Sequence, residues 1–283
     1  MRLVFLHGIN QQGKSAEIIR REWRGFLGNP GDLASIEIVV PFYGDVLPGA
    51  TGPATPEQAV AMGIPGDDEE REFVTSALHQ AALERGLTRE LIEREQAITP
   101  GPLEDRRFLA ILRLLEKLSP FKGGLFLLLV RQAYSYLRRD HVTSRVDGIV
   151  RPCLTDGCVV IGHSLGSVIG FKLLRELEVK VPLFTTLGSP LALEAVKSAL
   201  RRPRAVPAGV TRWYNGLDVD DLVTLGKPLT QETFAGGIFN NSSIENGEDA
   251  HAIEGYLGDA DFFSRENLTD LLCATPMSRG GAI

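Results

Sequence analysis

Short apolar runs alternate with segments of helical periodicity along much of this chain. The apolar runs predict strands at residues 3–6, 36–43, 158–161, 183–187, 211–215 and 236–242. Apolar residues that recur on one helical stripe predict helices at residues 14–27, 142–154, 167–177, 193–200 and 251–257. Strands that alternate with helices favour a mostly parallel central sheet flanked by helices, so the pattern predicts an α/β fold.

A long helical insertion interrupts this alternation. Residues 48–56 are rich in Gly, Pro and Ala and predict a loop, and helical periodicity then covers residues 70–85, 104–118 and 124–139. We therefore expect an α/β core of residues 1–51 and 146–283 and a helical cap, or lid, of residues 52–145. Residues 126–130 are all apolar, so their helix needs cover on more than one face. Packing against the sheet, weak contact with a membrane surface and a dimer contact are the alternative interpretations of this run.

Composition narrows the classes of partner. The net charge of −6 argues against nucleic acid, because phosphate contacts need clustered Lys and Arg. The three cysteines show no Cys-x-x-Cys spacing and predict neither a metal site nor a disulfide framework. Met1 and Arg2 lead directly into a strand rather than into a signal peptide, and the longest apolar run is too short to span a bilayer. We expect a cytoplasmic protein without a transmembrane segment.

The segment Gly162-His163-Ser164-Leu165-Gly166 lies between an apolar strand and a predicted helix. This is the layout of a nucleophile elbow, in which a tight, strained turn holds the serine hydroxyl clear of the sheet. The flanking glycines leave room because they carry no Cβ, and the N-terminus of the following helix favours developing negative charge. The motif predicts Ser164 as a nucleophile. The alternative is a glycine-rich turn with an incidental serine.

The general base has to come from one of five histidines. His163 is adjacent to Ser164 and cannot readily reach back to accept its proton, so we expect a structural role for it. In α/β-hydrolases the nucleophile, the acid and the histidine follow one another in this order along the chain. Only His251 lies after the main predicted strands, so we expect it to be the base.

Three aspartates beyond the predicted strand at 211–215 compete for the role of the acid, which fixes the histidine tautomer and stabilises the imidazolium. Asp221 is favoured because the apolar Leu222 and Val223 that follow it can anchor its loop. Asp218 lies nearer the strand end and is the alternative acid. Asp220 has neither advantage.

Two backbone amides are expected to form the oxyanion hole, because they must point at the oxygen that becomes negative. One is the amide of Leu165, directly after the nucleophile. The other comes from the loop after the first strand, where the His7-Gly8 turn points to the amide of Ile9.

The residues in several of these segments resemble a known family. The segments are Phe5-Leu6-His7-Gly8-Ile9-Asn10-Gln11-Gln12-Gly13, Gly162-His163-Ser164-Leu165-Gly166, Leu187-Gly188-Ser189-Pro190, Trp213-Tyr214-Asn215 and His251-Ala252-Ile253-Glu254-Gly255-Tyr256-Leu257. Together they resemble bacterial α/β-hydrolases related to lipases and to GPI-inositol-deacylase-like hydrolases. The resemblance covers residues 1–45 and 142–260 and leaves out the insertion.

The resemblance implies an α/β-hydrolase fold and a serine esterase of the lipase type that forms an acyl-enzyme. It implies a catalytic triad of Ser164, Asp221 and His251, a small-molecule or lipid ester as substrate, and no cofactor or metal. Two other functions stay open. One is an acyltransferase that uses the same triad with an alcohol or amine acceptor. The other is a catalytically idle binding module that keeps the fold.

Overall fold

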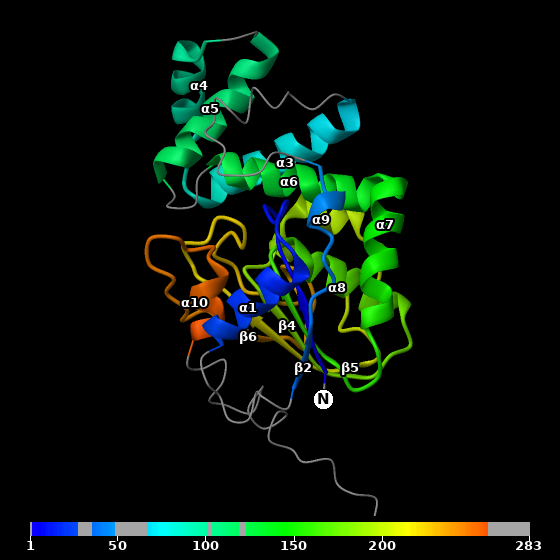
Figure 1. The fold of residues 1–283 in the computed structure, drawn as a ribbon. Coiled ribbons are helices and arrows are strands. Elements are labelled where there is room, and N and C mark those ends of the chain that lie inside the picture. The colour runs from blue at the N-terminus through cyan, green and yellow to red at the C-terminus, as the bar shows by residue number, and fades with distance from the viewer. Residues whose placement is uncertain (1, 28–35, 49–66, 101–102, 119–122, 260–283) are drawn as a thin grey trace, which may run out of the picture.

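A computed structural model describes residues 2–27, 36–48, 67–100, 103–118 and 123–259 (Figure 1). Within these ranges six strands form one parallel sheet in the order β2-β1-β3-β4-β5-β6. The strands are β1 (Arg2–Leu6), β2 (Glu37–Val39), β3 (Val159–His163), β4 (Val181–Leu187), β5 (Val210–Gly216) and β6 (Phe239–Asn241). The helices are α1 (Ala16–Phe26), α3 (Asp68–Glu84), α4 (Arg89–Ile98), α5 (Leu103–Leu118), α6 (Gly123–Arg138), α7 (Asp140–Val150), α8 (Leu165–Glu176), α9 (Glu194–Ala199) and α10 (Ile253–Gly258). The expected α/β class with a parallel sheet flanked by helices is confirmed.

Apolar layers cover both faces of the sheet, because successive side chains of a strand point to opposite faces. Leu3 and Phe5 of β1 pack in one layer with α1 and α10. Val4 and Leu6 of the same strand pack in the other layer with α8. All five residues of β3 are buried, which explains why this strand reads as a continuous apolar run in the sequence.

Polar side chains begin several of the helices. Ser15, Asp67 and Thr88 precede α1, α3 and α4, and each side chain accepts a hydrogen bond from a backbone N–H in the first helical turn. Such caps satisfy donors that have no partner within the helix. The first turn of α3 is also acidic, which suits the positive end of the helix dipole.

The described part of the insertion forms α3 to α6 and the beginning of α7. Figure 1 places α3 and α6 beyond the end of the sheet that is opposite to the marked N-terminus, at the carboxyl ends of the strands. The C-terminal end of α3 contacts the segment 190–194 through Gln80, which donates to Ala192 O at 3.5 Å and accepts from Glu194 N at 2.8 Å. Residues 52–66, which we assigned to the cap, lie outside the described residues.

The apolar run Phe126–Val130 lies in α6 and is buried at every position. The largest exposed fraction among the five side chains is 4%, at Leu128. The run is part of the main hydrophobic core, together with residues of α3 and α5. These five side chains are therefore not accessible to a membrane surface or to a second subunit, and those two interpretations of the run are wrong. None of the described helices is long and apolar enough to cross a membrane.

The structure corrects several element boundaries. The run at 36–43 contributes only three residues to the sheet as β2, and the run at 236–242 only three as β6, because both lie at the edges. The helix α4 was not predicted. It carries five charged residues among ten and buries only Ile92, so its apolar stripe is weak. The last helix begins at Ile253, and His251 therefore precedes it in a turn.

Candidate active site

The candidate site lies where the strand order changes direction. From β1 the chain passes to β2 on one side, and it returns to β3 on the other side of β1. In open α/β sheets such a switch point leaves a crevice outside the carboxyl ends of the strands, and ligands bind there. The loops that leave the two adjacent strands carry His7 and Ser164, so the predicted oxyanion loop and the predicted nucleophile meet at this switch point.

Ser164 occupies a strained turn between β3 and α8. Its backbone angles are φ 54° and ψ −125°, a left-handed conformation that non-glycine residues rarely adopt. Its backbone N–H donates to Leu187 O at 2.9 Å, which ties the turn to the end of β4. The side chain is fully buried, and Oγ makes no hydrogen bond with any described group. Leu165 is the first residue of α8, so its amide lies at the helix N-terminus.

Two glycines allow the chain to pack this closely around Ser164. A Cβ at Gly166 would stand 2.1 Å from Leu6 O, so only glycine fits between α8 and β1. A Cβ at Gly8 would lie 2.8 Å from Ser164 Cβ and 3.4 Å from Ser164 Oγ. The loop after β1 therefore runs directly beside the serine side chain.

His251 is hydrogen-bonded to Asp221, one of the two candidate acids. The distance from His251 Nδ1 to Asp221 Oδ2 is 2.8 Å, and both side chains are buried. The other carboxylate oxygen, Oδ1, accepts from Val223 N at 2.9 Å. The same Oδ2 atom accepts a second hydrogen bond at 2.8 Å from the hydroxyl of Tyr256 in α10. The carboxylate is thus fixed at both oxygens.

Asp218 faces backbone amides rather than the histidine. Its Oδ1 accepts from Asp220 N at 2.8 Å, and its Oδ2 accepts from Asn246 N at 2.7 Å. It therefore shapes the loop after β5 and anchors the segment before His251. The side chain of Asp220 is mostly exposed and forms an ion pair with Arg85 at 3.7 Å.

His163 connects the nucleophile turn to His251. Its Nε2 lies 3.0 Å from the backbone oxygen of His251, and the two ring centroids are 4.7 Å apart. Burial lowers the pKa of His163 well below its usual value, and the neighbouring His251 lowers it further. The neutral ring can therefore donate from Nε2 to the His251 carbonyl. His163, the residue directly before Ser164, therefore packs against His251, which we expect to be the base.

The loop after β1 is held by His7 and Tyr43. Tyr43 N donates to His7 Nε2 at 3.2 Å, and His7 Nδ1 lies 2.8 Å from Gly8 O, so Nδ1 carries the proton. Burial lowers the pKa of His7 to about 4, which keeps the ring neutral. The Tyr43 hydroxyl donates to His7 O. Gln11 Nε2 donates to Ile9 O at 3.1 Å and braces the residue expected to supply an oxyanion amide.

Tyr43 and Tyr256 are the site contacts that sequence reasoning missed. Tyr256 lies in a segment that resembles the hydrolase family, five residues after His251, but nothing in its spacing indicates a bond to Asp221. Tyr43 follows β2, and only the parallel pairing of β2 with β1 brings it to the loop that contains His7.

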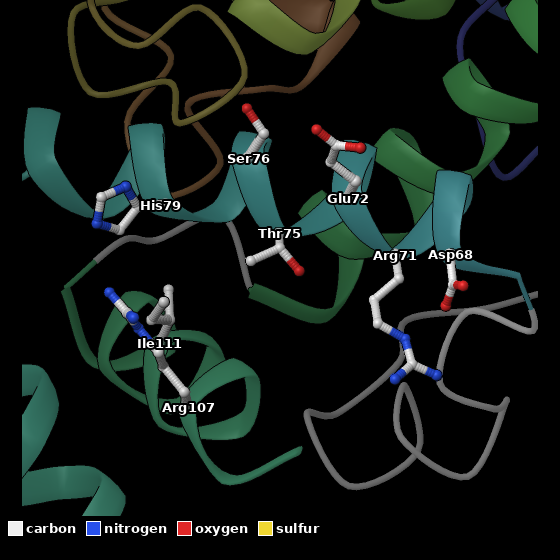
Figure 2. A pocket seen from close by; sticks show the side chains of 8 residues that line it. All are labelled: Asp68, Arg71, Glu72, Thr75, Ser76, His79, Arg107 and Ile111. Carbon is white, nitrogen blue, oxygen red and sulfur yellow. The ribbon is translucent and has the colours of Figure 1, made fainter. Parts of the chain in front are cut away.

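A separate hollow of about 520 Å³ lies between α3 and α5, as Figure 2 shows. Its lining comprises Asp68, Arg71, Glu72, Thr75, Ser76, His79, Arg107 and Ile111. None of the residues predicted for the triad or the oxyanion hole is among them, so this hollow is distinct from the candidate site. In the described ranges, no group of three His, Cys, Asp or Glu side chains could hold a metal ion.

No protein-family model matches this chain, and no curated protein sequence matches it. What the chain does is therefore inferred from the geometry of its own residues. That geometry combines a strained serine at a strand-to-helix turn with a buried Asp–His pair behind it.

Proposed function

We propose that this chain is a serine hydrolase of the α/β-hydrolase fold that cleaves carboxylic esters through an acyl-enzyme. The observation that carries the proposal is the left-handed turn at Ser164 beside the hydrogen-bonded pair of His251 and Asp221. A strained backbone at a serine between a strand and a helix is typical of a catalytic elbow. A purely structural serine gains nothing from such a conformation.

The order and placement of the groups support the same proposal. The nucleophile follows β3, the acid follows β5 and the histidine follows β6, which is the α/β-hydrolase order of nucleophile, acid and base. A Cβ at Gly188, directly after β4, would lie 3.0 Å from Asp221 Oδ2 and 3.1 Å from His251 Cε1. Since Ser164 N is bonded to the adjacent Leu187 O, the serine turn and the Asp–His pair are neighbours at this edge of the sheet.

The proposed reaction has two halves. Ser164 Oγ attacks the ester carbonyl carbon while His251 Nε2 takes the hydroxyl proton, and the carbonyl oxygen becomes an oxyanion held by the amides of Ile9 and Leu165. The bond to the leaving alcohol then breaks as His251 returns the proton to it. Water attacks the acyl-enzyme by the same route and releases the acid. Asp221 keeps the Nδ1–H tautomer of His251 and stabilises the imidazolium in both halves.

A fluorophosphonate probe tests the nucleophile directly. The wild-type protein should take up one probe per chain, and Ser164→Ala should take up none. Ser144→Ala, at an exposed serine of α7, is the matched control and should label like the wild type. Labelling that persists in Ser164→Ala would overturn the assignment, and a wild-type protein that neither labels nor hydrolyses esters would favour the binding module.

Product analysis separates the hydrolase from the acyltransferase. A panel of p-nitrophenyl esters is offered with and without added alcohol or amine acceptors. A hydrolase releases free carboxylic acid in both cases. Transfer of the acyl group to the acceptor as the main product, with little free acid, would assign the chain as an acyltransferase.

A further inference from the structure

Tyr256 connects both ends of the acid loop. Its hydroxyl donates to Asp221 Oδ2 at 2.8 Å and its oxygen accepts from Asp218 N at 3.1 Å. The side chain is fully buried in the layer between α10 and the sheet. Burial, followed by the charge of Asp221, raises the pKa of Tyr256 well above its usual value, so the hydroxyl keeps its proton.

The geometry points to Tyr256 as a positioning residue of the proposed triad. Asp221 Oδ2 is shared between His251 and Tyr256, with 2.8 Å to each. The phenol holds this oxygen towards the imidazole and takes up part of its negative charge. It therefore limits how strongly Asp221 stabilises the charged form of His251.

The charged and titratable groups around His251 come from four segments. Asp221 lies in the loop after β5, His163 at the end of β3 and Tyr256 in α10, and Asp249 Oδ1 accepts from His251 N at 3.3 Å. Among these described groups, only the Tyr256 hydroxyl shares the oxygen Asp221 Oδ2 with the His251 ring. Removal of that hydroxyl deletes none of the other three groups, although it also takes away the acceptor of Asp218 N.

The first test is a titration of the His251 ring by nuclear magnetic resonance in wild type, Tyr256→Phe and Tyr136→Phe. Loss of the Tyr256 hydroxyl should move the midpoint of the ring titration upwards by about half a pH unit or more, because Asp221 then holds more charge. Tyr136→Phe is the matched control. It deletes the hydroxyl of an equally buried tyrosine that donates to Asp147 at the same 2.8 Å, and it should leave the midpoint unchanged.

This readout needs no substrate, although the effect on turnover rests on the proposed ester hydrolysis. In Tyr256→Phe the acid limb of kcat/KM should move with the ring titration. The plateau kcat should fall about tenfold, because Asp221 Oδ2 is then no longer held towards the imidazole. KM should change by less than about twofold, because Tyr256 lies behind the acid. An unmoved titration midpoint would overturn the inference even if the protein is an active esterase. A moved midpoint in a protein without esterase activity would uphold it and overturn only the proposed function.

Replacement of Tyr256 by 3-fluorotyrosine gives a second variant that keeps the hydroxyl. Its phenol is more acidic and donates more strongly, so the midpoint of the His251 titration should move downwards. Opposite shifts in the two variants support the inference, and shifts of the same sign contradict it. If Tyr256→Phe does not fold, the fluorinated variant alone is the test. A lowered midpoint then supports the inference, and an unchanged midpoint contradicts it.

Discussion

The strain at Ser164 predicts an unusual response to glycine. Ser164 adopts φ 54° and ψ −125°, and a side chain held there costs about 1–3 kcal/mol. Ser167, one turn into α8, is equally buried but has helical backbone. Exchange of Ala for Gly at position 167 should cost about 1 kcal/mol in helix propensity and about 0.8 kcal/mol for the lost buried methyl group. The same exchange at 164, which precedes α8, should cost little, because relief of the strain offsets the lost contacts of the methyl group.

The comparison uses four variants, with Ala and Gly at each of the two positions. Thermal or urea unfolding followed by circular dichroism gives the free energy of unfolding for each. Replacement of Ala by Gly should be less costly at 164 than at 167 by about 2–4 kcal/mol, or roughly 4–8 °C in Tm. About 1 kcal/mol of this difference is the helix propensity lost at 167, and the rest is the strain relieved at 164. All four variants lack the serine hydroxyl, so its hydrogen bonds do not affect the difference. A difference of about 1 kcal/mol or less would refute the idea that the turn stores strain.

Four further predictions concern the acid, the insertion and a buried histidine. Asp221→Asn should lower kcat by on the order of 10³ and Asp218→Asn by much less, and steady-state ester kinetics showing the reverse ranking would transfer the role of the acid. If the cap forms an apolar acyl pocket, long-chain p-nitrophenyl esters should be preferred to acetate by about 0.8 kcal/mol for each buried CH₂, and equal kcat/KM across the series would contradict the pocket. Leu128→Glu should lower the free energy of unfolding by several kcal/mol, because Leu128 is only 4% exposed; a wild-type urea midpoint would contradict this. The pKa of His7 is lowered from 6.5 to about 4 in the folded state, so its neutral form contributes stability that is complete above pH 6.5 and is lost as the pH falls to about 4. The loss should reach about 3 kcal/mol, and His7→Gln should show a flatter stability profile over the same pH range.

Much of the core could be predicted from the sequence because its central strands are buried on both faces. Val159, Val160 and Ile161 read as one apolar run, and the glycines after them mark the turn. Edge strands and charged helices were harder to predict from the sequence. The run at 36–43 is apolar beyond β2, but only three of its residues find a hydrogen-bonding partner strand.

The contacts behind the candidate site could be predicted only in part. Asp218 and Asp221 both follow β5 closely, so chain distance does not separate them, and only the apolar residues after Asp221 favoured it as the acid. In the structure Val223 is buried, and its backbone N–H donates to Asp221 Oδ1. The bond from Tyr256 to the same carboxylate depends on how α10 packs on the sheet. No local pattern in the sequence encodes that packing.

The two links between α3 and the loop at 218–227 limit how far the insertion can be treated as a module. Arg85 donates to Asp220 O at 2.6 Å across 135 positions of sequence, and Lys227 contacts Glu84 at 2.5 Å across 143. The segment that carries Asp221 is therefore fastened to the insertion as well as to the sheet. A chimera in which the insertion is replaced or deleted would also change the support of that segment. A chimera that exchanges residues 218–227 together with the insertion keeps both partners of the Arg85–Asp220 and Glu84–Lys227 contacts.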